Sequence, residues 1–111
     1  MSQSKQPHEA ISDQERNMPR NRPGWYDVII LDDEDTRSSF VRRILVAVFG
    51  YTPLDAVLTT TTIEACGLAR VGTYRYSEAR AKVRTALRLA AEQEFPLRLT
   101  LCSSRRAPEN A

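Results

Sequence analysis

The stretch WYDVIIL, residues 25 to 31, constrains the fold more than any other part of the sequence. Its aromatic and β-branched residues favour a buried β-strand. Four acidic residues at positions 32 to 35 end the strand. Apolar residues then recur at helical spacing until Gly50, so the sequence predicts a first helix from about Thr36. A strand, an acidic turn and an amphipathic helix therefore open the ordered part of the chain.

A second helix is predicted to begin at TPLD, residues 52 to 55. Thr52 can cap it, and Pro53 suits a first turn in which no amide donor is needed. The helix should continue to about Glu64. Its last turn should be weak, because the four threonines at positions 59 to 62 are β-branched and lose rotamer freedom in a helix.

The rest of the chain predicts a strand, a helix and a last strand. GLARVGTYRY, residues 67 to 76, has the pattern of a strand, and a third helix should run from Ser77 to about Glu94. LRLTL, residues 97 to 101, alternates apolar and polar residues as a half-buried strand does. The order β-α-α-β-α-β predicts an α+β sandwich, with three helices on one face of a small three-stranded antiparallel sheet.

With 111 residues the chain has room for one domain, which we expect to span residues 25 to 102. Residues 1 to 24 are polar and contain three prolines, so they are expected to form a disordered tail. Residues 103 to 111 are expected to form a flexible C-terminal end.

Composition argues against several classes of function. A net charge of +2 is too small to indicate nucleic-acid binding, and no apolar run approaches the roughly 20 residues that span a bilayer. The two cysteines are far apart and no secretory leader is visible, so we expect a reducing cytoplasm. The predicted domain has no histidine to activate a nucleophile, and we expect no enzymatic activity, metal or cofactor.

The acids after the first strand could instead belong to a phosphoacceptor domain of the receiver kind, which holds magnesium at the edge of a parallel sheet. Such a domain also needs a second strand that ends in the phosphorylated aspartate, and a lysine after a later strand. The next aspartate, Asp55, lies at a helix start, and no lysine follows a strand. This interpretation is disfavoured.

The segments VIILDDEDTRSSFVRRILVAVFG and YSEARAKVRTALRLAAEQEFPLRLTL, with the helix start between them, resemble the ClpS family of protease adaptors. The resemblance runs without a gap from about residue 25 to 102. It implies a monomeric, non-enzymatic adaptor that binds the N-terminal residue of substrate proteins, the N-degron, and delivers them to a Clp-type AAA+ unfoldase.

The resemblance also implies which residues do this. An N-terminal ammonium group has three donors, so its recognition needs acceptors at the mouth of an apolar pocket. The acceptors implied are Asp32, Asp33, Glu34 and Glu64. The implied side-chain pocket consists of Ile30, Leu31, Thr36, Ser38, Val41, Thr60, Ile63 and Leu97.

Several of these positions depart from the family pattern. Asp32 stands where the family usually has asparagine, Glu64 where histidine is common, and Ser38 and Thr60 where methionines are common. We therefore expect a wider and more polar pocket, and four carboxylates that repel one another unless a cation lies among them. Three interpretations stay open: an N-terminus receptor with altered specificity, a pocket that has lost this role, and an adventitious cation site.

A second surface follows from the same resemblance. In ClpS proteins the start of the third helix docks on the N-terminal domain of the unfoldase, through a glutamate and a lysine among others. Lys82 matches the lysine, Ser77 occupies the place of the glutamate, and Glu78 follows it. The alternative function is an interaction protein of the same fold that docks on an unfoldase or another partner without recognising N-termini.

Overall fold

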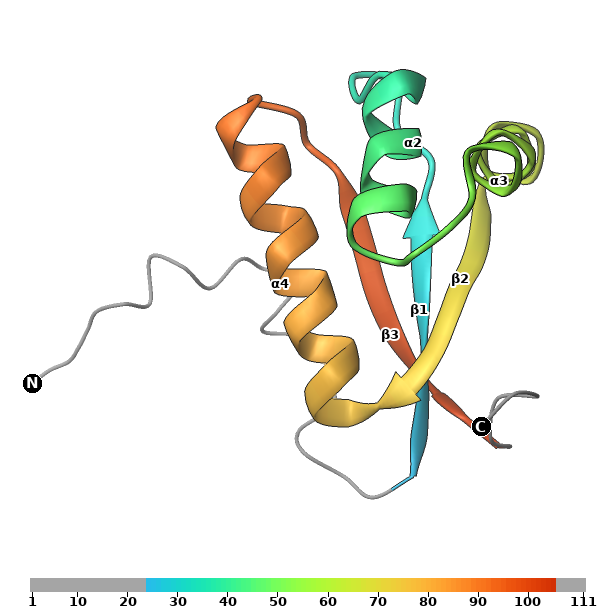
Figure 1. The fold of residues 1–111 in the computed structure, drawn as a ribbon, viewed down its shortest axis with the longest axis vertical. Coiled ribbons are helices and arrows are strands. Elements are labelled where there is room, and N and C mark those ends of the chain that lie inside the picture. Colours follow the sequence, from blue (N-terminus) through green and yellow to red (C-terminus); the bar gives the residue numbers. More distant parts are fainter. Residues whose placement is uncertain (1–23, 106–111) are drawn as a thin grey trace, which may run out of the picture.

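The computed structural model describes residues 24 to 105, and the predicted N-terminal tail lies outside this range except for Gly24. Within this range the chain forms three helices and three strands in the predicted order, which can be followed in Figure 1. Their bounds are β1 (Trp25–Leu31), α2 (Ser38–Ala47), α3 (Pro53–Cys66), β2 (Leu68–Arg75), α4 (Tyr76–Glu92) and β3 (Arg98–Ser104).

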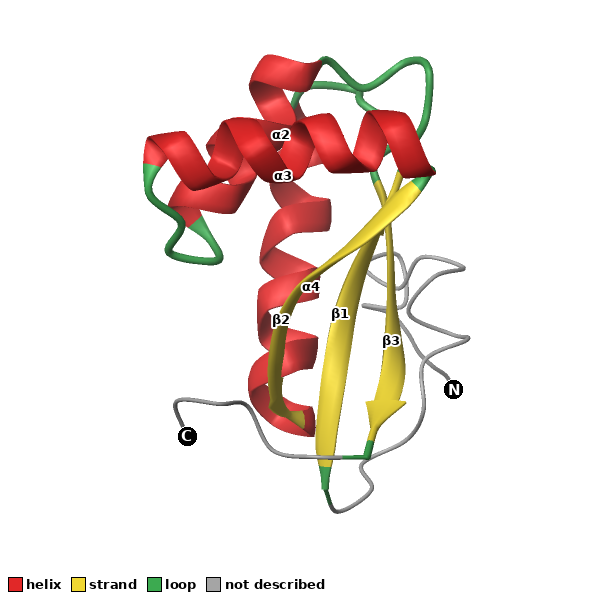
Figure 2. Ribbon diagram, turned by 90° about the vertical axis from the view of Figure 1, so that its right-hand side faces the viewer, coloured by secondary structure: helices red, strands yellow, loops and turns green. Residues whose placement is uncertain are grey.

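The strands form one antiparallel sheet in the order β2-β1-β3. β1 is central and pairs along its whole length with both neighbours. α4 lies along the sheet, while α2 and α3 gather beyond the end where β1 stops (Figures 1 and 2). The predicted α+β fold is confirmed. The receiver-like interpretation is wrong, because it needs a parallel sheet and the strands of residues 24 to 105 are antiparallel.

The core forms where the helices meet β1. Alternate residues of this strand, Tyr26, Val28 and Ile30, are buried because successive side chains point to opposite faces of a sheet. α4 contributes mainly small buried side chains, which let its backbone come close to the sheet; they are Ala79, Val83, Ala86 and Ala90. The apolar stripe of α2 fills the remaining space with Phe40, Val41, Ile44 and Leu45.

The first helix begins two residues later than the predicted start at Thr36. Its N-cap is Arg37, which has an extended backbone and makes no side-chain capping bond. Asp33 instead accepts hydrogen bonds at Oδ1 from the backbone N–H groups of Asp35 (2.9 Å) and Thr36 (2.7 Å). These two bonds fold residues 33 to 36 into a turn, and the helix can start only after it.

The second helix begins where predicted but continues past Glu64 to Cys66. Thr61 and Thr62 donate their hydroxyl protons to the carbonyl groups of Val57 and Leu58, one turn earlier, at 3.0 and 3.1 Å. Such bonds satisfy threonine hydroxyls inside a helix. The threonine run therefore does not end α3.

Gly67 ends α3 in a left-handed conformation with φ of 90°. Its N–H donates to the carbonyl of Ile63 at 2.8 Å, as in many glycine-terminated helices. At the other end of the chain, β3 extends to Ser104, beyond the predicted strand end at residue 101 and into the segment expected to be flexible. Residues 106 to 111 lie outside the described range.

Candidate functional site

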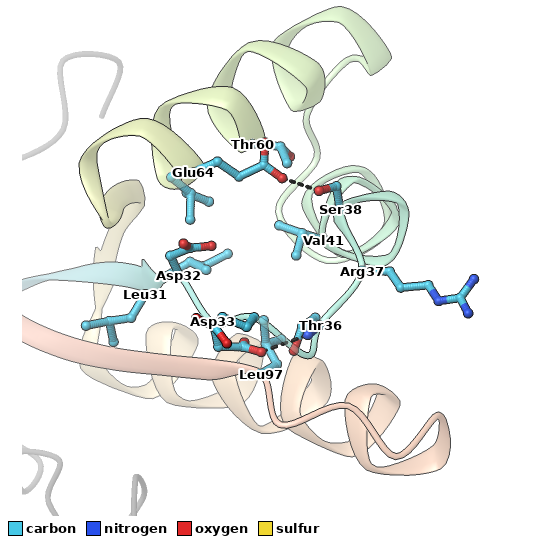
Figure 3. Close-up of a pocket in the computed structure, with 13 residues that line it drawn as sticks. Leu31, Asp32, Asp33, Thr36, Arg37, Ser38, Val41, Thr60, Glu64 and Leu97 are labelled. Carbon is cyan, nitrogen blue, oxygen red and sulfur yellow. Dashed lines mark hydrogen bonds between the residues drawn. The ribbon is translucent and has the colours of Figure 1, made fainter.

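A pocket opens at the carboxyl end of β1, between the first turns of α2 and the second half of α3 (Figure 3). Its cavity volume is about 360 Å³, within the range of small-molecule sites. Every residue expected from the sequence to bind an N-terminal amine or to form the side-chain pocket lines this cavity. Placement around a cavity does not show binding, so these roles remain predictions.

Five parts of the chain position the lining, one of which is the turn of residues 32 to 37 between β1 and α2. Ile30 and Leu31 come from the end of β1, and Ser38 and Val41 lie one helical turn apart on α2. Leu97 directly precedes β3. α3 contributes a set at helical spacing, so that its members share one face: Thr60, Ile63 and Glu64.

The inner walls are apolar and well buried. Ile30, Val41, Ile63 and Leu97 are each less than a tenth exposed. The sequence predicted all four as pocket residues. Arg37 also lines the cavity and was not predicted. Figure 3 shows the side chain of Arg37 extending away from the pocket, so we do not count Arg37 among the candidate binding residues.

The acidic residues sit at the rim. Asp32 and Glu34 are exposed, and Asp33 is half-buried. The backbone of Asp32 is fixed by its N–H group, which donates to the carbonyl of Gly67 at 2.9 Å. Asp33 is fixed through its side chain, because its Oδ1 atom holds the turn that precedes α2. The rim therefore displays negative charge on a backbone held by hydrogen bonds.

Glu64 has a partner that the sequence did not predict. The hydroxyl of Ser38 donates to Oε2 of Glu64, which joins α2 to α3 across the pocket (Figure 3). Two departures from the ClpS pattern, the serine and the glutamate, are thus paired with each other. They lie 26 residues apart in the sequence on different helices, so no local pattern could have indicated the contact.

The expected convergence of four carboxylates is not observed. Within residues 24 to 105, no group of three or more His, Cys, Asp or Glu side chains is arranged so that it could hold a metal ion. The acids line one pocket but do not form a ligand cluster. Residues 24 to 105 thus give no support to the interpretation of the pocket as an adventitious metal site.

Two hydroxyl groups of the lining lack partners. The Oγ1 atoms of Thr36 and Thr60 are buried and make no hydrogen bond. Thr60 is the buried polar residue of the described core, with 4% of its surface exposed. The pocket lining thus contains polar groups, as expected. These two hydroxyls, however, have no hydrogen-bond partner within residues 24 to 105.

The residues expected to dock on an unfoldase lie on α4. Ser77 and Glu78 are exposed in the first turn of this helix. Figure 1 shows α4 beginning at the end of the sheet that lies away from α2 and α3. Lys82 is half-buried. Its Nζ donates to the carbonyl of Val48 at 3.1 Å and lies 5.2 Å from the ring centroid of Tyr74. This ammonium therefore caps the end of α2, a structural role that the sequence did not predict.

Within the described part of the chain, no helix has both the length and the apolar character that crossing a membrane requires.

The family model described as "ATP-dependent Clp protease adaptor protein ClpS" matches residues 21–100. A curated relative named "ATP-dependent Clp protease adapter protein ClpS" from Acetivibrio thermocellus is 39% identical over 87 residues, which are 78% of this chain and 88% of the relative. The protein of the same name from Clostridium acetobutylicum is 35% identical over 80 residues, 72% of this chain and 79% of that one.

A solved structure has the same fold. It is described as "The structure of Agrobacterium tumefaciens ClpS2 bound to L-phenylalaninamide" and superposes with a TM-score of 0.71. The two sequences are 31% identical, and the match covers 75% of this chain and all of the other. Both the sequence and the fold thus point to the same group of proteins.

Proposed function

Because the chain belongs to the ClpS family of ATP-dependent Clp protease adaptors, we propose that it is a non-enzymatic cytoplasmic adaptor that binds the N-terminal residue of substrate proteins. It delivers them to a Clp-type AAA+ unfoldase. The observation that carries the proposal is the pocket of about 360 Å³, in which acidic groups at the rim stand beside buried apolar walls.

The two parts of the pocket suit the two parts of an N-terminal residue. A free α-amine is protonated for the most part at neutral pH and offers three donors. Asp32 and Glu64 place carboxylates at the rim, where they can accept from it. The apolar walls of Ile30, Val41 and Ile63 can enclose the side chain. The A. tumefaciens relative was solved with L-phenylalaninamide, which combines a free amine with an apolar ring.

One observation favours the alternative function, an adaptor-fold protein that docks on a partner without recognising N-termini. Ser38 donates to Oε2 of Glu64, so part of the hydrogen-bonding capacity of this carboxylate is already used before an amine arrives. The choice between the two functions depends on whether a free amine binds despite this bond.

Fluorescence anisotropy with labelled peptides that differ only in their first residue decides between them. Peptides that begin with Leu, Phe, Trp, Tyr, Arg or Met are each tested with a free and an acetylated amine. The proposal expects at least one free-amine peptide to bind about tenfold or more tightly than its acetylated partner, because acetylation removes the charge that the rim contacts. If the free-amine and acetylated forms bound equally for all six peptides, the result would favour the docking alternative.

Rim variants test where the amine binds. Asp32→Ala and Glu64→Ala should each weaken binding of the preferred free-amine peptide without changing the weak binding of its acetylated form. Asp55→Ala is the matched control, since Asp55 is an exposed acid on α3 outside the pocket. Equal losses in all three variants would mean that general negative charge, and not the rim, attracts the peptide.

We assign the proposed docking surface to Ser77, Glu78 and Lys82 on α4. Binding to the purified N-terminal domain of a Clp unfoldase can be measured by calorimetry. Glu78→Ala should weaken it without lowering thermal stability, because the side chain is exposed. Arg98→Ala, an exposed change on β3, should leave binding intact. Lys82→Ala should lower both binding and stability, since Lys82 also bonds to Val48.

A further inference from the structure

Thr60 differs from its neighbours in the threonine run of α3. The hydroxyls of Thr61 and Thr62 are exposed and donate to carbonyl groups one helical turn earlier. The hydroxyl of Thr60 is buried and makes no hydrogen bond. The local helix therefore accounts for the other two hydroxyls but not for this one.

A hydroxyl at this position is unfavourable for the fold alone. Thr60 has 4% of its surface exposed, and its hydroxyl has no hydrogen-bond partner within residues 24 to 105. A buried hydroxyl without a partner destabilises a protein, whereas valine has the same shape and no polar atom to satisfy. Something other than packing is needed to explain why residue 60 carries an oxygen.

A second unsatisfied hydroxyl lines the same cavity. The Oγ1 atom of Thr36 is also buried without a partner. Figure 3 places Thr60 on the α3 side of the pocket and Thr36 on the opposite side, near Leu97, with Val41 between them. Because a threonine in a helix populates two side-chain rotamers, the methyl and hydroxyl groups of Thr60 can exchange places beside an occupant of the pocket.

We propose that the hydroxyls of Thr36 and Thr60 recognise a hydrogen-bonding group on the side chain of the bound N-terminal residue, so that the pocket selects tyrosine over phenylalanine. This inference rests on the proposed function. The apolar walls hold the aromatic ring, and the phenol oxygen both donates and accepts, so it can pair with either threonine. A site that offers buried polar groups discriminates against the analogue that leaves them unpaired.

The first experiment uses the unaltered protein and three free-amine peptides that differ only in the first residue: phenylalanine, tyrosine or 4-methylphenylalanine. The tyrosine peptide should bind about fivefold or more tightly than the phenylalanine peptide, the ratio expected for one net hydrogen bond. The 4-methylphenylalanine peptide fills the same space as tyrosine without bonding, so it should show no such gain. Equal affinity for tyrosine and phenylalanine, or an equal gain with the methyl group, would overturn the inference.

The second experiment removes the hydroxyls from the protein. Thr60→Val and Thr36→Val should each lower the ratio of tyrosine to phenylalanine affinity toward one, because each removes a hydroxyl that the phenol can pair with. Thr60→Val should also melt at a temperature no lower than that of the unaltered protein, because it removes an unsatisfied group. Thr61→Val is the matched control and should keep the ratio. A ratio unchanged in both pocket variants would overturn the assignment to these threonines.

The two proposals fail in different ways. If no free-amine peptide binds better than its acetylated form, the proposed function is wrong and this inference falls with it. If free-amine peptides bind but tyrosine and phenylalanine bind equally, the proposed function stands and only the inference about Thr36 and Thr60 is wrong.

Discussion

Asp33 combines a structural role with a proposed binding role at the rim of the pocket. Its Oδ1 atom accepts two backbone hydrogen bonds and so shapes the turn between β1 and α2. Its negative charge lies at the rim proposed to bind an amine. The turn needs only an acceptor oxygen, whereas attraction of an ammonium group needs the charge. The two roles can therefore be separated by substitution.

Asp33→Ala should lower the free energy of unfolding by about 1 kcal/mol, as losing a side-chain cap does. Asp33→Asn keeps an oxygen for the turn, so its stability should stay close to that of the unaltered protein. Urea unfolding measures both. Both variants should bind the preferred free-amine peptide more weakly, because both lack the charge. If Asp33→Asn bound as tightly as the unaltered protein, Asp33 would act on the turn alone.

Tyr51 is a half-buried phenol whose protonated form is favoured by the fold. Its hydroxyl donates to the carbonyl of Val71 at 2.9 Å. Burial raises its pKa above the usual value near 10, and burial likewise raises the pKa of Tyr74. A raised folded pKa stabilises the protein below the pKa of the unfolded chain, and this contribution is lost as the pH rises through the folded value.

Tyr51→Phe should therefore cost about 1 kcal/mol of stability between pH 7 and 9, where the hydrogen bond to Val71 is intact in the unaltered protein. Above about pH 10 the difference between the two proteins should shrink, because the Tyr51 phenol ionises more readily in the unfolded chain than in the folded protein, and the phenylalanine variant has no such group. Urea unfolding across this pH range measures the difference. A gap that stayed constant to pH 11 would contradict the raised pKa of Tyr51.

At the scale of the elements, the end of α3 connects the fold to the pocket. Gly67 ends the helix at a positive φ, and its carbonyl accepts the N–H of Asp32 at the rim. Because residues other than glycine are strained in this conformation, a side chain here would disturb both the helix end and the contact with Asp32. Gly50 also has a positive φ, but it lies outside the pocket lining.

Gly67→Ala and Gly50→Ala should each lower the free energy of unfolding by about 1 to 2 kcal/mol. A Cβ at either position meets no atom within 4 Å, so backbone strain is the expected cause and not a clash. Only Gly67→Ala should also weaken peptide binding, through Asp32. Thermal melts and peptide anisotropy on both variants test this. Equal loss of binding in the two would show that stability, and not the rim, limits affinity.

The type and order of the elements could be predicted because their signals are local. The β-branched run of β1 and the helical apolar spacing of α2 lie within single segments. The ends of the helices were predicted less accurately, because they depend on side-chain contacts. Asp33 accepts two backbone hydrogen bonds in a turn, so α2 begins only at Ser38, and α3 continues through the threonine run to Cys66.

The residues that line the candidate site could be predicted from the sequence, but the contacts between them could not. The resemblance to ClpS proteins located every predicted residue at one cavity, since the fold brings these positions together. The bond between Ser38 and Glu64, the contact of Lys82 with Val48 and the unsatisfied hydroxyl of Thr60 all depend on tertiary geometry. Neither spacing nor composition carries that information.

At the scale of the molecule, a single hydrophobic core joins the sheet to the helices. The buried residues of the described chain form a single cluster that includes the sheet, α2, α3 and α4. A small domain with one core is expected to unfold in a single cooperative step. The lone tryptophan, Trp25, lies at the start of the central strand with the guanidinium of Arg75 4.1 Å from its ring centroid, so its fluorescence reports on the sheet.

Leu45 on α2 is fully buried and lies outside the pocket lining. Leu45→Ala should lower the free energy of unfolding by about 2 to 5 kcal/mol, as large-to-small changes in a core do. In urea, the transition seen by Trp25 fluorescence should coincide with that seen by far-UV circular dichroism, because helix and sheet unfold together. Separate transitions would show that the helices can unfold while the sheet persists.

The pairing of β1 with β3 has a consequence for how the protein is made. Among the strands of residues 24 to 105, β1 is synthesised first and β3 last, yet they are neighbours along their whole length. A nascent chain cannot complete its sheet until residue 104 has left the ribosome. Until then β1 lacks its pairing with β3, and its apolar side chains are not fully covered. Leu97, a wall of the pocket, emerges just before β3, so the pocket is not complete until translation of the domain is nearly finished.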